Sequence, residues 1–300
     1  MTYSIVARDP ETGRLGVAVQ SHWFSVGSVV SWAEAGVGAV ATQSFAERSY
    51  GPLGLELMRR GRSAPEALET LVHADESREV RQVAFVDASG QVGVHTGDDC
   101  IREFGHLAGD GFSVQANMME RDTVWTAMAN AYRSAEGDLP DRLLAALSAA
   151  QAERGDIRGM QSAAMLVVEA EPTGNEWDDR VLDLRVEDHA TPVDELARVV
   201  RLWRAYGYAE RAEELELADD LDGALEERLH ALEIQPDHPE LAFWAAVAMA
   251  SAGRFDEARR TAAIAHDAHS GWVELLHRVI AGGQVELSDE AVRALLPESD

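Results

Sequence analysis

The sequence contains no lysine, so all 26 of its basic residues are arginines, and they face 53 acidic residues for a formal net charge of −27. A nucleic-acid-binding protein normally presents a basic face, and this charge balance argues against that class and against binding to acidic membrane surfaces. The carboxylates are spread along the chain rather than gathered in a tail. This pattern suits a salt-rich cytoplasm, in which ions screen the self-repulsion, and we therefore expect a salt-adapted protein.

Cysteine is nearly absent as well. Cys100 is the single cysteine, so no disulfide can form within the chain, which is typical of a reducing compartment. The longest apolar run, residues 242–250, is too short to span a bilayer. Met1 is followed by neither the basic nor the apolar region of a secretory signal. We expect a soluble, cytoplasmic protein.

The first two hundred residues alternate between strand and helix patterns. Residues 2–8 and 15–21 flank a turn at 9–13, and pairing them as a hairpin places Thr2 opposite Gln20 or Ser21. Hairpins with helices inserted between them predict an α+β layered domain rather than alternating βαβ units. Further strands are predicted at 37–44, 80–87, 91–97, 111–118, 162–169 and 180–186, and helices at 50–61, from Ser63, at 121–135, at 139–153 and from Thr191 to Tyr206.

After residue 206 the pattern is helical and repeats at an offset of 34, so that 219–224 aligns with 253–258. This is typical of tetratricopeptide repeats, with Leu221 and Phe255 at the large-residue position and Ala224 and Ala258 at close helix contacts; a plain antiparallel helical array is the alternative. We predict two repeats and a cap. The domains expected are residues 1–206, a helical region at 207–284 and a tail at 285–300.

Position 2 is the strongest candidate for chemistry. A small residue after Met1 permits removal of that methionine, which would leave Thr2 with a hydroxyl and an α-amine of reference pKa about 7.7–8.0. Such an amine can take the hydroxyl proton near neutral pH and so activate a nucleophile. The alternative is that Thr2 simply begins an edge strand.

Several segments within residues 2 to about 203 resemble an uncharacterised family placed in the N-terminal-nucleophile (Ntn) hydrolase superfamily. They include TYSIVARDPETGRLGVAVQS, AGVGAVATQS, GDGFSVQANMM and RGDIRGMQSAAMLVV. The resemblance implies a four-layer αββα sandwich in which the N-terminal strand is central and Thr2 is the nucleophile. It implies no substrate. Ala116 and Met160 depart from the glycine and arginine usual in that family.

The other candidate site residues are polar residues near predicted strand ends. Asn117 could donate to an oxyanion or close its strand, and Ser21 could bond the α-amine or cap a strand end. Gln43 and Ser44 could face the nucleophile or satisfy a loop. Some superfamily members place a lysine near the nucleophile, and with no lysine here Arg8, on the same strand, is the candidate.

No HExxH or paired-cysteine motif and no phosphate-binding glycine pattern occurs, so we expect neither a metal nor a cofactor. The predicted function is hydrolysis of an amide bond in a small molecule or peptide. The alternative is an inactive binding or scaffold protein that docks a protein partner on its helical repeats. A homo-oligomer is expected in either case.

Overall fold

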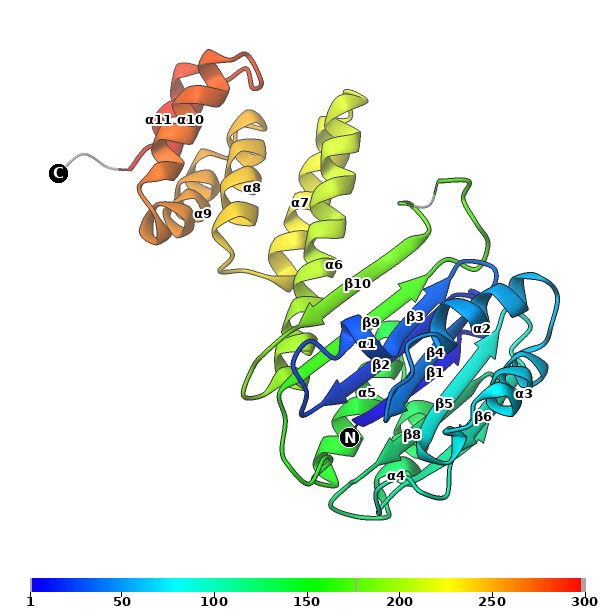
Figure 1. Cartoon of the computed structure of the whole chain (residues 1–300). Helices are drawn as coiled ribbons and strands as arrows, with labels where there is room; N and C mark the ends of the chain where they lie inside the picture. Colours follow the sequence, from blue (N-terminus) through cyan, green and yellow to red (C-terminus); the bar gives the residue numbers. More distant parts are fainter. Residues whose placement is uncertain (1, 176, 298–300) are drawn as a thin grey trace. The chain divides into compact units, whose positions relative to one another are not determined.

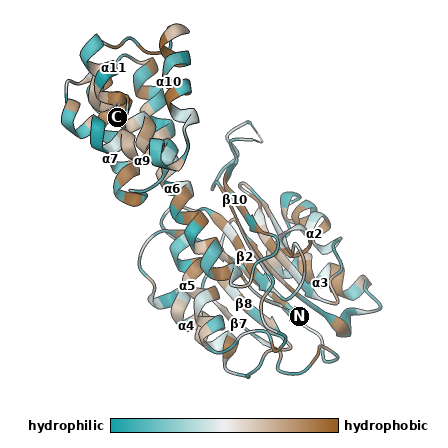
Figure 2. Cartoon of the chain, turned by 90° about the vertical axis from the view of Figure 1, so that its left-hand side faces the viewer, coloured by the Kyte–Doolittle hydropathy of each residue, from teal (hydrophilic) through white to brown (hydrophobic). Residues whose placement is uncertain are grey.

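The computed structural model describes residues 2–175 and 177–297 (Figure 1). The chain forms two compact units that divide between Arg198 and Val199. This division lies inside helix α6 (Pro192–Leu217), which continues beyond the end expected near residue 206. Hydrophilic and hydrophobic residues both occur along α6 (Figure 2). None of the helices in the described part of the chain has the length and apolar character needed to cross a bilayer.

The first unit contains a six-stranded sheet in which every neighbouring pair of strands is antiparallel. Strand β1 lies between β2 and β8, so it is not an edge strand. Thr2 is opposite Ser21 in β2, which confirms the predicted hairpin register, and opposite Asn117 in β8. In spatial order the strands are β10 (Arg180–Val186), β9 (Ser162–Val168), β2 (Leu15–Ser21), β1 (Thr2–Arg8), β8 (Phe112–Asn117) and β7 (Gly105–Gly109).

A second, four-stranded antiparallel sheet packs on the first, with β4 against β1 and β2 and with β5 against β1 and β8. Its strands, in order, are β3 (Ser31–Glu34), β4 (Gly38–Ser44), β5 (Arg81–Asp87) and β6 (Val92–Thr96). The sequence did not predict β3 or β7. Strand β3 has only four residues, and two of the five residues of β7 are glycines, which weakens a strand pattern.

Helices contact the outer face of each sheet. Helices α4 (Val124–Ser134) and α5 (Leu139–Ala152) contact the six-stranded sheet, while α2 (Tyr50–Arg59) and α3 (Ala64–Ala74) contact the four-stranded sheet. A capping box begins α3, with Ser63 and Glu66 bonded reciprocally, at the predicted start of this helix. Two short helical turns complete this unit, α1 (Gly27–Val30) and η1 (Arg78–Val80).

The space between the two sheets has two chemically different halves. The apolar half is a core of buried residues that includes Val6, Leu15, Val17, Ala41 and Ala84. The polar half contains buried polar side chains, namely Ser4, Gln43, Gln82, Gln115 and Asn117. Alternate residues of a strand face the same side, so Thr2, Ser4 and Val6 all point into this space. Strand β1 therefore contributes to both halves.

The second unit is helical. Ala224 and Ala258, predicted at close helix contacts, are 1% and 0% exposed, whereas Leu221, predicted at the large-residue position, is 60% exposed. Leu221 is the first residue after the N-cap Asp220, where the helix has not yet reached the core. Part of the expected tail at 285–300 is helical. The helices are α7 (Leu221–Ile234), α8 (Pro239–Ser251), α9 (Phe255–Ala268), α10 (Gly271–Ala281) and α11 (Asp289–Leu295).

The expected class, a mixed α and β chain with antiparallel sheets followed by a helical region, is confirmed.

Candidate active site

Thr2 lies where three strands of the six-stranded sheet meet a cavity. Because neighbouring strands are antiparallel, the first residue of β1 is beside the last residues of β2 and β8, Ser21 and Asn117. Thr2 is only 4% exposed, and all three residues line a cavity of about 530 Å³. Strand β4 ends at the same cavity with Gln43 and Ser44.

Five of the six predicted site residues therefore meet at one cavity: Thr2, Ser21, Gln43, Ser44 and Asn117. The rest of the wall is made of three arginines and seven apolar residues. The arginines are Arg48, Arg81 and Arg158, and the apolar residues are Trp23, Val26, Val29, Val30, Phe45, Ala46 and Ile101.

Hydrogen bonds fix Thr2 at both its side chain and its backbone. The Thr2 hydroxyl donates to Ser21 Oγ at 3.0 Å. The Thr2 carbonyl oxygen accepts from Gln43 Nε2 at 3.2 Å and, more weakly, from Asn117 Nδ2 at 3.4 Å. The orientation of the candidate nucleophile is thus set by the three polar residues that the sequence placed near it.

Gln82, which is not among the predicted site residues, joins them. Its side-chain oxygen accepts from Gln43 Nε2 at 2.7 Å and from Asn117 Nδ2 at 2.9 Å. Its amide nitrogen donates to the carbonyl of Ala116 at 3.0 Å. A glutamine inside the buried strand pattern VRQVAFVD was the available signal, because a buried polar group needs partners.

Asn117 has limited capacity to donate to a substrate. An asparagine amide nitrogen has two hydrogens, and one of them is committed to Gln82. The other forms only the long contact to the Thr2 carbonyl, so it is the hydrogen that a substrate oxygen could take.

Arg8 does not belong to the site, and the prediction that it is the positive partner of Thr2 is wrong. It ends β1 opposite Leu15, and its Nε donates to the carbonyl of Ala88 at 2.8 Å. Six residue steps along a strand separate it from Thr2 by about 20 Å. The arginines at the cavity come from other segments, whose position in space the sequence does not reveal.

Arg158 is held at the cavity by a buried carboxylate. Asp156 is 2% exposed and accepts from Arg158 Nε at 3.1 Å and Nη2 at 2.9 Å. The backbone N–H of His22, directly after β2, also donates to Asp156, at 3.2 Å. Paired, charge-assisted bonds of this kind restrict the guanidinium to one orientation. Asp156 thereby couples the position of Arg158 to the end of β2.

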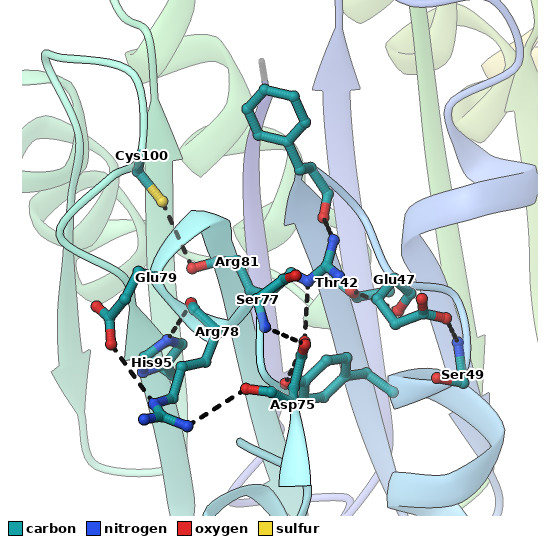
Figure 3. A network of polar contacts seen from close by, with 12 residues as sticks. Thr42, Glu47, Ser49, Asp75, Ser77, Arg78, Glu79, Arg81, His95 and Cys100 are labelled. Carbon is teal, nitrogen blue, oxygen red and sulfur yellow. Dashed lines mark hydrogen bonds and ion pairs between the residues drawn. The ribbon is translucent and has the colours of Figure 1, made fainter. Parts of the chain in front are cut away.

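Arg81 fixes the loop at 45–49 (Figure 3). Its Nε is 2.9 Å from Asp75 Oδ2, and its Nη1 donates to the carbonyl of Phe45 at 2.6 Å. Burial acts to raise the pKa of Asp75, but the hydrogen bonds from Arg81 and from the Ser77 amide outweigh it and hold that pKa below its usual value. Arg81 therefore links the loop that carries Phe45 and Arg48 to the ionised carboxylate of Asp75.

The strands that end at the cavity leave it through unusual backbone conformations. Ser25, Ser44 and Met118 follow or end β2, β4 and β8 and have φ values of 54°, 69° and 56°. The left-handed region costs a non-glycine residue about 1–2 kcal/mol. Such strain is retained where surrounding contacts determine the backbone, and Ser44 itself lines the cavity.

A metal centre has no support in the described residues. Within residues 2–175 and 177–297, no group of three or more His, Cys, Asp or Glu side chains is placed to hold a metal ion. The polar groups at the cavity are hydroxyls, side-chain amides and arginine guanidinium groups.

Comparison with known proteins identifies the family. A family model described as "Family of unknown function (DUF1028)" matches residues 2–196. The crystal structure of protein SPO2555 from Silicibacter pomeroyi, which carries the same family description, is 30% identical with a TM-score of 0.60, over 67% of this chain and 88% of that chain.

Anbu (ancestral beta-subunit) from Yersinia bercovieri is 12% identical with a TM-score of 0.32, over 69% of this chain and 93% of that chain. This similarity is too weak to support a functional inference. No curated protein matches the chain. The family match and the SPO2555 relative agree, and the chain belongs to the DUF1028 family.

Proposed function

We propose that this protein hydrolyses amide bonds with Thr2 as its nucleophile, after removal of Met1. The observation that carries the proposal is the place of Thr2: it is the first residue of the central strand β1, and it lines a cavity together with Ser21, Gln43 and Asn117. A hydroxyl and a free α-amine on one residue supply a nucleophile and its base without another side chain.

The proposed reaction has two steps. In the first, the hydroxyl oxygen of Thr2 attacks the amide carbonyl carbon, the α-amine takes the hydroxyl proton and passes it to the leaving nitrogen, and an ester forms on Thr2. In the second, water attacks the ester, and the α-amine takes a proton from the water and passes it to the Thr2 oxygen as the ester bond breaks, which releases the acid and restores the free hydroxyl and amine. Asn117 Nδ2 is the candidate donor to the oxyanion. The bond from the Thr2 hydroxyl to Ser21 orients the nucleophile.

Membership of the Ntn hydrolase superfamily is part of the same proposal. Two antiparallel sheets in contact, with α4 and α5 on one and α2 and α3 on the other, support a four-layer αββα sandwich. The central position of β1 supports it too, because the nucleophile of that superfamily begins a central strand.

For the second unit we propose two tetratricopeptide-like repeats and a cap. Buried alanines recur at the predicted spacing of 34 residues, with Ala224 and Ala258 as one pair and Ala231 and Ala265 as another. Docking of a protein partner on these helices, the scaffold alternative and homo-oligomer formation stay predictions. The binding or scaffold alternative would be supported if deletion of residues 207–300 abolished oligomerisation or partner capture while Thr2→Ala changed nothing.

A salt-rich cytoplasm is our proposal for the protein's location, supported by the net charge of −27 and the single cysteine. The melting temperature should rise from dilute buffer to molar potassium chloride. An unchanged melting temperature would contradict salt adaptation.

The proposed function is tested by intact mass. Protein from its native host should lack Met1, and incubation with a β-lactone should add one acyl group, which peptide mapping should place on Thr2. Thr2→Ala, which also permits methionine removal, should gain no adduct, whereas the control Thr70→Ala on α3 should be labelled like the wild type. Retention of Met1 would reject the proposal, because the amine would then be locked in a peptide bond.

A further inference from the structure

The charge of the cavity is opposite to that of the chain. The sequence has 53 acidic and 26 basic residues, about two acidic residues for each basic one. The described residues that line the cavity include three arginines and no aspartate or glutamate. A wall of this kind attracts anions in a protein whose overall field repels them.

The three arginines differ in their partners. Arg81 and Arg158 pair with Asp75 and Asp156, and neither carboxylate lines the cavity. Arg48 is exposed and forms no ion pair with any described residue. The carboxylate of its neighbour Glu47 instead accepts from the Ser49 amide at 3.1 Å. Among the three cavity arginines, Arg48 is therefore the one that no carboxylate of the described residues pairs with.

The apolar part of the cavity wall is accessible to a ligand. Trp23, Phe45 and Ile101 line it while being 60%, 55% and 41% exposed. Large apolar side chains with this much accessible surface at a cavity provide contact area that a bound molecule would cover. The three valines at 26, 29 and 30 extend the same wall.

We infer that the cavity binds an amide that carries a carboxylate beside an apolar group, as in an N-acyl amino acid, with the carboxylate on Arg48 and the apolar group on Trp23, Phe45 and Ile101. The planar guanidinium matches a carboxylate with two parallel hydrogen bonds, which a neutral amide cannot form with it. The inference rests on the proposed function for the reaction of the bound amide, but it makes a separate claim about binding.

The test measures binding without turnover. Three probes that share the hexanoyl chain would be titrated calorimetrically into full-length Thr2→Ala protein: N-hexanoylglycine, its neutral glycinamide and the cationic N-hexanoyl-ethylenediamine. The anion should bind about fivefold more tightly than the neutral amide, a ratio suited to an ion pair in a partly exposed cavity. The cation should bind most weakly.

Matched variants assign this preference to Arg48. In Arg48→Gln, added to the Thr2→Ala background, the preference for the anion should fall to about equal binding. Arg62→Gln removes the same charge from an exposed arginine that does not line the cavity and has no ion pair among the described residues, and it should keep the ratio. Melting temperatures of both variants would check their folding.

The outcomes separate the two proposals. Equal or tighter binding of the neutral amide, failure of all three probes to bind, or an unchanged ratio in Arg48→Gln would overturn this inference. Tight binding of N-hexanoylglycine without cleavage by the wild-type protein would support it and count against the hydrolase. Cleavage of the glycinamide in preference to the anion would support the hydrolase and overturn the inference.

Discussion

The apolar half and the polar half of the space between the sheets are built from the same strands with opposite chemistry. In the apolar half, Val6 and Leu15 are removed from water and contribute about 25 cal/mol for each Å² of buried apolar surface. In the polar half, Gln43 and Gln82 are just as buried, but a hydrogen bond inside a protein adds only about 1 kcal/mol net. The apolar half therefore stabilises the fold. The polar half contributes less to stability, but its hydrogen bonds fix the position of Thr2.

The largest effect should come from removing the hydroxyl in the polar half. Thr2→Ala should lower kcat/KM by about 10³-fold or more on an amide that the wild type cleaves, because no other group replaces the nucleophile. Thr2→Ser keeps a hydroxyl and an α-amine, and should keep measurable turnover. Stability should change little, since the side-chain hydroxyl donates one hydrogen bond. Wild-type turnover in Thr2→Ala would contradict the proposed role.

In the apolar half the effect should be on stability instead. Leu15 is fully buried, and Leu15→Ala should lower the free energy of unfolding by about 2–5 kcal/mol, measured by urea denaturation. Activity of the folded fraction should be retained, because Leu15 is at the opposite end of β2 from Ser21. Leu53→Ala, at a position 49% exposed, serves as the control and should cost less than about 0.5 kcal/mol. Equal losses in the two variants would refute the distinction.

A change at Gln82 should affect both stability and activity. Gln82→Met keeps the length of the side chain but leaves Gln43 Nε2 and Asn117 Nδ2 without their shared acceptor. Unsatisfied buried donors cost about 1–3 kcal/mol of unfolding free energy, and the loosened contacts to the Thr2 carbonyl should also lower kcat. The exposed Gln91→Met is the matched control. Full activity with reduced stability would limit Gln82 to a structural role.

The smallest effect should be a pH dependence outside both halves, at Asp75. The pKa of Asp75 is lowered in the folded state, so its ionised form stabilises the fold. This contribution is complete above the unfolded pKa of about 3.9, and it is lost as the pH falls through the lower pKa of the folded state. Asp75→Asn should cost about 1 kcal/mol at neutral pH and should flatten the acid limb of the stability curve. Parallel stability curves for the two proteins would show that the Arg81 pair contributes nothing.

The sequence predicted those parts of the site that depend on local pairing. The turn at 9–13 fixed the register of β1 and β2, so the contact of Thr2 with Ser21 could be expected. Asn117 was predicted because an asparagine side chain can donate to an oxyanion, although its neighbour β1 is more than a hundred residues earlier in the chain.

The remainder depends on tertiary contacts or on weak local signals. Arg48 and Arg158 line the cavity from loops. The position of these loops depends on tertiary packing, which the local sequence does not reveal. The domain boundary expected at residues 206 and 207 lies inside α6 and not at a helix end. Gly207 does not interrupt this helix, because a glycine inside a helix costs only about 1 kcal/mol relative to alanine.

The central place of β1 has a consequence for biosynthesis. Its neighbour β2 is made at once, but β8, its neighbour on the other side, ends only at Asn117. At ribosomal rates of about 5–20 residues per second, one edge of the first strand stays open for roughly 5–20 s. During this interval, an enzyme that removes the initiator methionine can reach the N-terminus of the nascent chain, because β8 has not yet paired with β1.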